Sequence, residues 1–210
     1  MKRILIREAA EHVGTEVKLC GWISVRRDHG KLVFFVLRDR SGSVQLVITP
    51  EKSEVIESAK DVRSEYAVTV TGLVKGRPAK KGQEASASPT DHIEIEVTAL
   101  SILSKPLEEL PIDVSQPEMN LQLETLLNNR TAALRNPKVQ AIFTIYSALL
   151  EGYADFMRQE GFIEIKTPKI LSAATEGGAN FFKIKYFDRD AYLAQSPQFY
   201  KQMFVNGGFE

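Results

Sequence analysis

The chain has 210 residues, 43% of them hydrophobic and 26% charged, which is the composition of an ordinary soluble globular protein with room for one large or two modest domains. Lysine and arginine together number 27, and so do aspartate and glutamate, so any contact with nucleic acid must come from a local basic patch and not from a global excess of charge. The single cysteine, Cys20, excludes an intramolecular disulfide, and the apolar run at residues 4–6 is too short for a signal peptide or a membrane span, so we expect a cytoplasmic protein without membrane contact.

The first hundred residues are typical of an all-β domain. Short segments rich in β-branched and aromatic residues predict five strands, at residues 17–25, 32–37, 44–48, 67–74 and 93–99. A helix is predicted between the third and fourth strands, at residues 51–63, and a loop of Gly, Ser, Ala and Pro between the last two, at residues 80–91. This order of elements is that of an OB-fold, so the predicted fold class is a β barrel over residues 1–104 followed by an α+β region.

A proline-rich stretch separates the barrel from the second half of the chain. Pro106, Pro111 and Pro117 stand among charged residues, which disfavours helix and strand, so residues 105–130 are predicted to be a linker or hinge. The remaining residues, 131–210, are predicted to form the second domain.

A long amphipathic helix opens this second domain. Asn136-Pro137 is typical of a helix start, and Gly161 is expected to end the helix. Its apolar positions at helical spacing are Val139, Ile142, Phe143, Tyr146, Leu149, Leu150, Tyr153, Phe156 and Met157. Such a wide apolar face can cover a sheet and also present a surface to a partner, and periodicity alone does not distinguish this from a helix that only covers a core. A strand at residues 162–165 and a hairpin around Asp188 are predicted to follow.

One face of the second predicted strand is a candidate nucleic-acid surface. Strand alternation puts Phe34 and Val36 on one face and Phe35 and Leu37 on the other, and only one face can be core. If Phe34 lies outward, an unpaired base can stack on it, worth about 1–3 kcal/mol per base, with Arg26, Arg27 and Lys31 near enough to meet phosphates. The alternative is that Phe34 is an ordinary core aromatic residue.

Two polar residues on other strands are candidates for reading that base. The amide of Gln45 both donates and accepts hydrogen bonds, and the carboxylate of Glu94 accepts from an exocyclic amine. Both residues are equally consistent with solvated positions on an exposed strand face.

The last forty residues contain the groups needed to hold an amino acid. Glu176 offers a carboxylate for an ammonium group, in a loop where Gly177-Gly178 lets the backbone fold over a ligand as a lid. Lys201 offers a cation for a side-chain carboxylate, while Ser196 and Gln198 supply hydrogen bonds, so the pattern favours an acidic ligand. The alternatives are a surface turn with a solvated glutamate and an exposed helix lysine.

Taken together, these segments resemble the class II aminoacyl-tRNA synthetases of the aspartyl, asparaginyl and lysyl subgroup, and most closely its archaeal and eukaryotic aspartyl type. The barrel resembles the anticodon-binding OB-fold of this subgroup in Gly21-Trp22-Ile23, residues 31–39 and Val44-Gln45. Residues 126–135 resemble the start of the catalytic domain, and residues 137–168 resemble motif 1, with Pro168 its characteristic proline. Residues 176–179 resemble the flipping loop, and residues 195–201 the aspartate-binding signature.

The resemblance implies a function for each segment. Phe34, Gln45, Glu94 and Arg26 would bind the anticodon of tRNA(Asp). L-aspartate would be held by six residues: Glu176, Ser196, Gln198, Phe199, Tyr200 and Lys201. The family joins aspartate to ATP with Mg²⁺, transfers the aspartyl group to tRNA and forms homodimers through motif 1.

The resemblance also implies what the chain lacks. The arginines of motifs 2 and 3 would follow Glu210, so we expect no catalytic residue and no metal ligand in this chain, which looks like the N-terminal part of a longer, antiparallel-sheet enzyme and would not activate aspartate alone. Two alternatives remain: a short, non-catalytic RNA-binding paralogue, and an asparaginyl enzyme. Whether charging would be strict for aspartate codons or extend to asparagine codons is left open.

Overall fold

The computed structural model describes residues 1–30, 32–77, 90–173 and 181–209. It divides into two compact units, Met1–Lys138 and Val139–Glu210, each considered by itself. The loop expected at residues 80–91 falls almost wholly outside the described residues, and so do Glu176 and the glycines that follow it.

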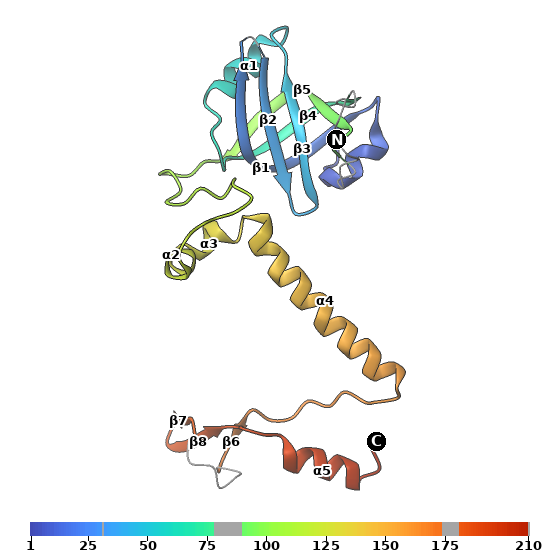
Figure 1. Ribbon diagram of the computed structural model, residues 1–210, viewed down its shortest axis with the longest axis vertical. Coiled ribbons are helices and arrows are strands. Elements are labelled where there is room, and N and C mark those ends of the chain that lie inside the picture. Colours follow the sequence, from blue (N-terminus) through green and yellow to red (C-terminus); the bar gives the residue numbers. More distant parts are fainter. Residues whose placement is uncertain (31, 78–89, 174–180, 210) are drawn as a thin grey trace. The chain divides into compact units, whose positions relative to one another are not determined.

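A closed five-stranded barrel forms most of the first unit, as predicted (Figure 1). Its strands are β1 (Glu16–His29), β2 (Leu32–Asp39), β3 (Gly42–Ile48), β4 (Ala67–Gly76) and β5 (Ile93–Ser104), preceded by a 3-10 helix, η1 (Ile6–His12). Their order around the barrel is β1-β2-β3-β5-β4, and β4 closes it by pairing with β1. The β3–β5 pair is parallel and the others are antiparallel, so the OB-fold expectation is confirmed.

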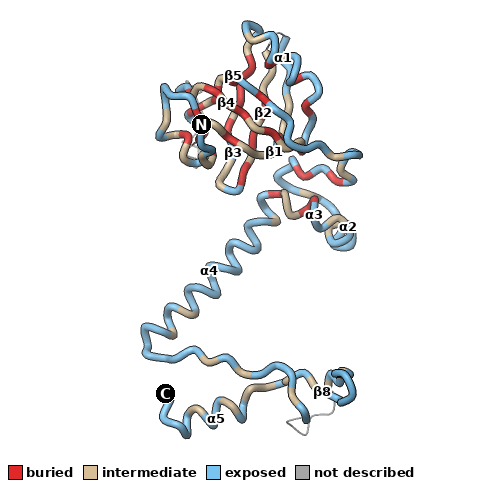
Figure 2. Tube along the Cα trace, turned by 180° about the vertical axis from the view of Figure 1, so that it is seen from behind, coloured by how far each residue is buried: buried red, intermediate tan, exposed pale blue. Residues whose placement is uncertain are grey.

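Alternation along the strands fills the barrel interior. On β2, Phe35 and Leu37 have no exposed surface, whereas Phe34 and Val36 are only partly buried on the outer side. Helix α1 (Ser53–Lys60) contributes Val55 to the same core. Figure 2 shows this buried interior in red. The barrel is therefore a rigid support whose outer face is available for binding.

The stretch between barrel and long helix is a packed structure with a small core of its own. It contains two short helices, α2 (Leu123–Asn128) and α3 (Arg130–Ala133). Ile112 and Val114 are buried against Ala132 and Ala133. The prolines do exclude helix and strand from residues 105–121, but apolar residues between them still bury their side chains.

Helix α4 (Pro137–Gln159) begins and ends at the predicted residues. The side-chain oxygen of Asn136 accepts a hydrogen bond from the Lys138 backbone N–H at 2.9 Å, as an N-cap does. At the other end Gly161 takes a left-handed φ of 86°, and the Phe162 N–H bonds to the Met157 carbonyl, which is the Schellman arrangement. None of the α4 side chains is buried within this structure, and Figure 2 shows the helix almost entirely in the exposed colour.

The second unit carries a three-stranded sheet in the order β6-β8-β7. It is built from β6 (Ile170–Leu171), β7 (Lys183–Tyr186) and β8 (Arg189–Leu193), and helix α5 (Gln198–Asn206) follows. The predicted hairpin is confirmed, with its turn at Phe187 and Asp188. The strand predicted at residues 162–165 is wrong: a β-branched segment becomes a strand only by pairing, and these residues pair with nothing in the described part of the chain.

Candidate nucleic-acid interface and amino-acid segment

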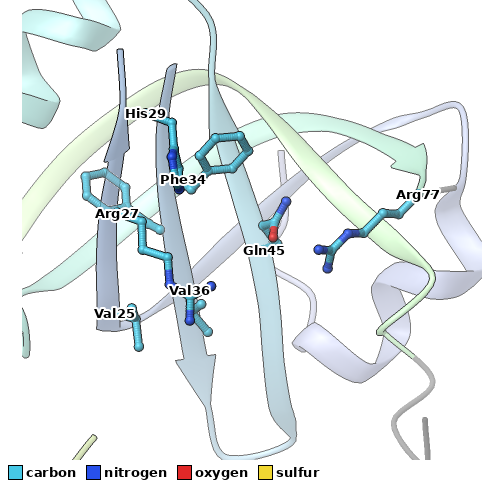
Figure 3. Close-up of a pocket in the computed structure, with 8 residues that line it drawn as sticks. Val25, Arg27, His29, Phe34, Val36, Gln45 and Arg77 are labelled. Carbon is cyan, nitrogen blue, oxygen red and sulfur yellow. The ribbon is translucent and has the colours of Figure 1, made fainter. Parts of the chain in front are cut away.

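Phe34 lies on the outer face of the barrel and forms part of a surface pocket. This is the orientation under which the sequence predicts a stacking platform. Side chains from neighbouring strands surround it, and Figure 3 shows Arg27, Phe34 and Gln45 projecting from adjacent strands, with Arg77 on the far side of Gln45. The full lining is Val25, Arg27, His29, Phe34, Phe35, Val36, Gln45 and Arg77.

Gln45 and Glu94 are directly hydrogen-bonded. They are register partners across the parallel β3–β5 pair, and Nε2 of Gln45 donates to Oε2 of Glu94 at 3.1 Å. Because a carboxylate only accepts hydrogen bonds, this contact directs the amide nitrogen toward Glu94 and turns the amide oxygen the other way. The structure thus brings together three of the four barrel residues predicted from the sequence.

Of the positive groups expected beside the platform, Arg27 is present, whereas Lys31 lies outside the described residues. Arg77 was not expected from the sequence. Arg27 is the register partner of Phe34 on β1, and Arg77 follows β4. The ring centre of His29 lies 5.8 Å from that of Phe34, edge to face. An aromatic ring flanked by arginines suits a base and its phosphate, since stacking and charge neutralisation act together.

Arg26 has a different environment from the one predicted. Its guanidinium donates through Nη1 to the carbonyls of Ala59, Lys60 and Val62 at 2.8–3.1 Å, and it lies 5.8 Å from the ring centre of Phe35. These contacts direct it to the C-terminal end of α1, and it is not among the residues lining the pocket. A bulge between Ile23 and Val25 shifts the alternation of β1, so that Arg27 pairs with the outward Phe34 and Arg26 with the buried Phe35.

The predicted aspartate-binding residues lie at the start of α5. The hydroxyl oxygen of Ser196 accepts from the backbone N–H of Gln198 at 3.2 Å, which helps to start the helix. Gln198 and Lys201 are three residues apart and share a side of α5, while Phe199 and Tyr200 point elsewhere. The four helical residues therefore do not converge on one ligand from α5 alone.

The remaining predicted site residues are only partly tested by the geometry. Glu176 lies outside the described residues, so its distance from Lys201 stays a prediction. Pro168 is exposed in an extended segment two residues before β6.

The hairpin before α5 carries an exposed ion pair. Lys183 Nζ lies 2.8 Å from a carboxylate oxygen of Asp190. The hydrogen bond from Lys183 lowers the pKa of Asp190 below its ordinary 3.8, and the same bond raises the pKa of Lys183 above its ordinary 10.5. Within the described ranges, no three His, Cys, Asp or Glu side chains gather as metal ligands would, and no helix is both long and apolar enough to span a membrane.

Comparison with known proteins assigns the barrel and the region that follows it. Residues 17–103 match the family described as OB-fold nucleic acid binding domain, and residues 122–210 match tRNA synthetases class II (D, K and N). The chain belongs to the class II tRNA synthetases of this group. The resemblance inferred from the sequence is therefore confirmed, and the barrel with the outward Phe34 is the OB-fold of a class II synthetase.

The chain is similar to relatives named aspartate–tRNA(Asp/Asn) ligase and to solved structures of asparaginyl-tRNA synthetases. An aspartate–tRNA(Asp/Asn) ligase of Aeropyrum pernix is 40% identical over 94% of this chain and 43% of its own length, and one of Methanococcus maripaludis is 42% identical with the same coverage. The structure of asparaginyl-tRNA synthetase from Pyrococcus horikoshii complexed with asparaginyl-adenylate has a TM-score of 0.83 at 32% identity, covering 99% of this chain and 46% of that chain. For Entamoeba histolytica asparaginyl-tRNA synthetase the TM-score is 0.74 at 28% identity, covering 95% and 44%. The chain thus spans less than half the length of these relatives.

Proposed function

We propose that this chain carries the tRNA-reading barrel and part of the amino-acid pocket of an aspartate–tRNA ligase, which activates L-aspartate with ATP and transfers it to tRNA(Asp). The observation that carries the proposal is the outward Phe34 beside the Gln45–Glu94 hydrogen bond, on the OB-fold of a class II synthetase chain. Both kinds of contact are what single-stranded anticodon bases require, because their faces are free to stack and their edges are free to pair.

In the barrel, each group has a separate task. A base stacks on Phe34, and the amide oxygen of Gln45 accepts from a ring N–H at the edge of the base. Glu94 fixes the orientation of that amide and accepts from an exocyclic amine of a neighbouring base. Arg27 and Arg77 neutralise the phosphates on either side, which makes the affinity dependent on salt.

In the second unit, the proposed pocket uses charge to select aspartate. Glu176 binds the ammonium group of the amino acid, and Lys201 binds its side-chain carboxylate. Ser196, together with Gln198 on the same side of α5 as Lys201, supplies hydrogen bonds to the ligand, whereas Phe199 and Tyr200 lie on another side of the helix and are not assigned a ligand contact. Lysine suits a carboxylate and offers nothing comparable to an uncharged amide, so Lys201 favours aspartate over asparagine.

ATP would supply the adenylyl group to the α-carboxylate of aspartate and release pyrophosphate, with Mg²⁺ neutralising the phosphates of ATP. The described residues contain no cluster of carboxylates that fits this ion, so none of them is assigned to it. The share of this chain in the reaction is to hold and orient the amino acid and the tRNA. We expect the complete enzyme in the cytoplasm, as a homodimer through α4 and Pro168.

Two experiments test the proposal. The first measures fluorescence anisotropy of a labelled tRNA(Asp) anticodon stem-loop with the 210-residue chain and with Phe34→Ala, using Ser101→Ala on β5 as the matched control. The expected result is about 10–100-fold weaker binding for Phe34→Ala only, as loss of one stacked base predicts. Unchanged binding would remove Phe34 from the interface.

The second experiment measures aspartate-dependent exchange of pyrophosphate into ATP by the complete enzyme. Lys201→Ala should abolish exchange, and retained exchange would defeat the pocket assignment.

Because asparaginyl relatives are similar in structure, asparagine is the competing substrate in the same assay. Charging of tRNA(Asp) and tRNA(Asn) transcripts decides whether the enzyme resembles its relatives named for both tRNAs. If the complete protein activates neither amino acid but the barrel binds RNA, a non-catalytic RNA-binding paralogue is the correct reading.

A further inference from the structure

Glu65 has an unusual backbone and an unusual environment. Its φ is +65°, and among the described residues only Phe187 is another non-glycine residue in this left-handed region. Glu65 is also buried, with 4% of its surface exposed. A residue with a Cβ pays conformational free energy for such a φ, so contacts of Glu65 must stabilise it there. One is its backbone N–H, which donates to the Ile23 carbonyl at 2.6 Å.

The Glu65 carboxylate is shared by two arginines from distant segments. Arg38 on β2 donates through Nη2 to both carboxylate oxygens, at 3.2 and 3.0 Å. Arg135 donates through Nη1 to Oε2 at 2.9 Å. The side chains of Glu65, Arg38 and Arg135 are 3%, 11% and 31% exposed, so the shared carboxylate is shielded from water. These three residues, here called the Glu65 cluster, all belong to the Met1–Lys138 unit.

Arg135 has a second contact with the barrel. Its guanidinium carbon lies 5.9 Å from the ring centre of Trp22, within the range of a cation–π interaction. Trp22 is the β1 register partner of Arg38, so the barrel provides both the anion and the aromatic face that hold Arg135. Arg135 stands two residues before α4 begins at Pro137.

The residues next to Arg135 are also fixed. Asn136, 1% exposed, donates through Nδ2 to the carbonyls of Val114 and Gln116 at 3.2 and 2.7 Å. A rigid segment around Arg135 means that the ion pair with Glu65 constrains the whole segment and not one mobile side chain.

One member of the cluster, Arg38, lies on β2, the strand that presents Phe34. Phe34 and Arg38 are four residues apart on β2, on the same face, which corresponds to about 13 Å along a strand. One rigid strand therefore carries Phe34 near one end and the attachment of the α4 start near the other.

We propose that Glu65 is a positioning residue that fixes residues 130–138, including the start of α4, to the barrel. The three members of the Glu65 cluster are not equivalent in this role. Loss of Arg135 releases the segment but leaves the Glu65–Arg38 pair intact within the barrel. Loss of the Glu65 charge leaves two arginines without their anion, which affects barrel and segment together.

Amide hydrogen exchange of the 210-residue chain tests this, because it measures local opening at each segment separately. In Arg135→Met, exchange should accelerate about tenfold or more at the amides of Ala132, Ala133 and Asn136, with β2 and β3 unchanged. Arg38→Met should accelerate exchange mainly in the barrel near Glu65, and Glu65→Gln in both places. The matched control is Arg158→Met, which removes an exposed arginine with an ion pair to Asp155 at 2.9 Å.

The proposal is overturned if Arg135→Met exchanges like Arg158→Met, or if its increase spreads evenly over the barrel. Arg135→Lys keeps the charge and should restore protection in part, whereas a purely steric role would give the same result for lysine and methionine. If Glu65→Gln does not fold, the two arginine variants still decide. RNA binding is a separate measurement, and Arg135→Met should retain it, so failure of the anticodon assignment does not affect this test.

Discussion

The side chain of Gln45 donates to that of Glu94 at 3.1 Å, across the parallel pairing of β3 with β5. The two residues are 49 positions apart in the chain, and only closure of the barrel brings them together. The contact gives the amide one orientation, in which its oxygen points away from Glu94 and is free to accept from a base edge.

Glu94→Ala should therefore weaken base discrimination more than it weakens affinity. Without the carboxylate the amide of Gln45 is free to turn, and it then accepts or donates according to the base. Anisotropy with stem-loops carrying each of the four bases at the contacted position measures this. Gln45→Ala should weaken binding of the preferred RNA by about 1–3 kcal/mol. The control for Glu94→Ala is Glu96→Ala, which removes another carboxylate from β5. If Glu94→Ala kept the base preference of the parent chain, Glu94 would have no part in reading the base.

Arg26 and Arg27 provide a matched pair of adjacent arginines with different surroundings. Arg27→Met should weaken RNA binding and reduce the slope of log affinity against log salt by about 1, since one phosphate contact is lost. Arg26→Met should leave RNA affinity unchanged but lower the free energy of unfolding by about 1–3 kcal/mol, because the carbonyls of Ala59 and Val62 lose a charged donor. Equal loss of affinity in the two variants would contradict the assignment.

The same pair shows where sequence reading succeeds and where it fails. Alternation correctly separates Phe35 from Phe34, because a strand has a fixed period of two. It does not reveal that Arg26 turns away from the pocket while Arg27 lines it, because a bulge adds one residue to the count and no local signal in residues 23–25 indicates it.

Contacts between residues that are distant in the sequence are the second feature that the sequence does not predict. Glu65 meets Arg135 across 70 positions, and nothing in the composition around either residue identifies the other. Likewise, Ile112 and Val114 stand in a proline-rich stretch that predicts a linker, yet they are buried because Ala132 and Ala133 fold back onto them. Local signals such as the Asn136 cap were predictable because both partners lie within two residues.

Asn136 joins two functions that different substitutions separate. Asn136→Ala should lower the free energy of unfolding, with loss of the cap alone accounting for about 0.5–2 kcal/mol. Asn136→Asp keeps the cap acceptor but places a buried carboxylate against the carbonyls of Val114 and Gln116, so it should destabilise at least as much as alanine. Urea unfolding measures both, with exposed Asn128→Ala as the control. If Asn136→Asp left the free energy of unfolding unchanged, the two hydrogen bonds to the carbonyls of Val114 and Gln116 would contribute little to stability.

Asp113 should titrate below its ordinary value. The hydroxyl of Ser115 first, then its backbone N–H and the Gln116 amide, lower the pKa of Asp113 from 3.8. A carboxyl whose folded pKa is depressed stabilises the fold above its unfolded pKa, so this contribution is present above pH 3.8 and is lost as the pH falls through the folded pKa. NMR titration of Ser115→Ala should show the Asp113 pKa moving up toward 3.8, with Ser101→Ala unchanged. An unaltered value would mean that Ser115 is not the main donor.

The apolar face of α4 gives a prediction about self-association. Tyr146, Leu149 and Tyr153 are 61–67% exposed and lie on one side of the helix at spacings of three and four residues. A contiguous exposed apolar surface of this kind marks a protein interface, and a second α4 is the partner that the proposed homodimer supplies.

Leu149→Arg should therefore raise the dissociation constant of the dimer by about tenfold or more, because the charge would be buried without a partner. Ser147→Arg places the same charge on the polar side and should have no effect. Sedimentation equilibrium of the 210-residue chain measures all three proteins. If the unsubstituted chain stayed monomeric at tens of micromolar protein, pairing through α4 would be overturned, because its exposed apolar face would then not bind a second copy of the chain.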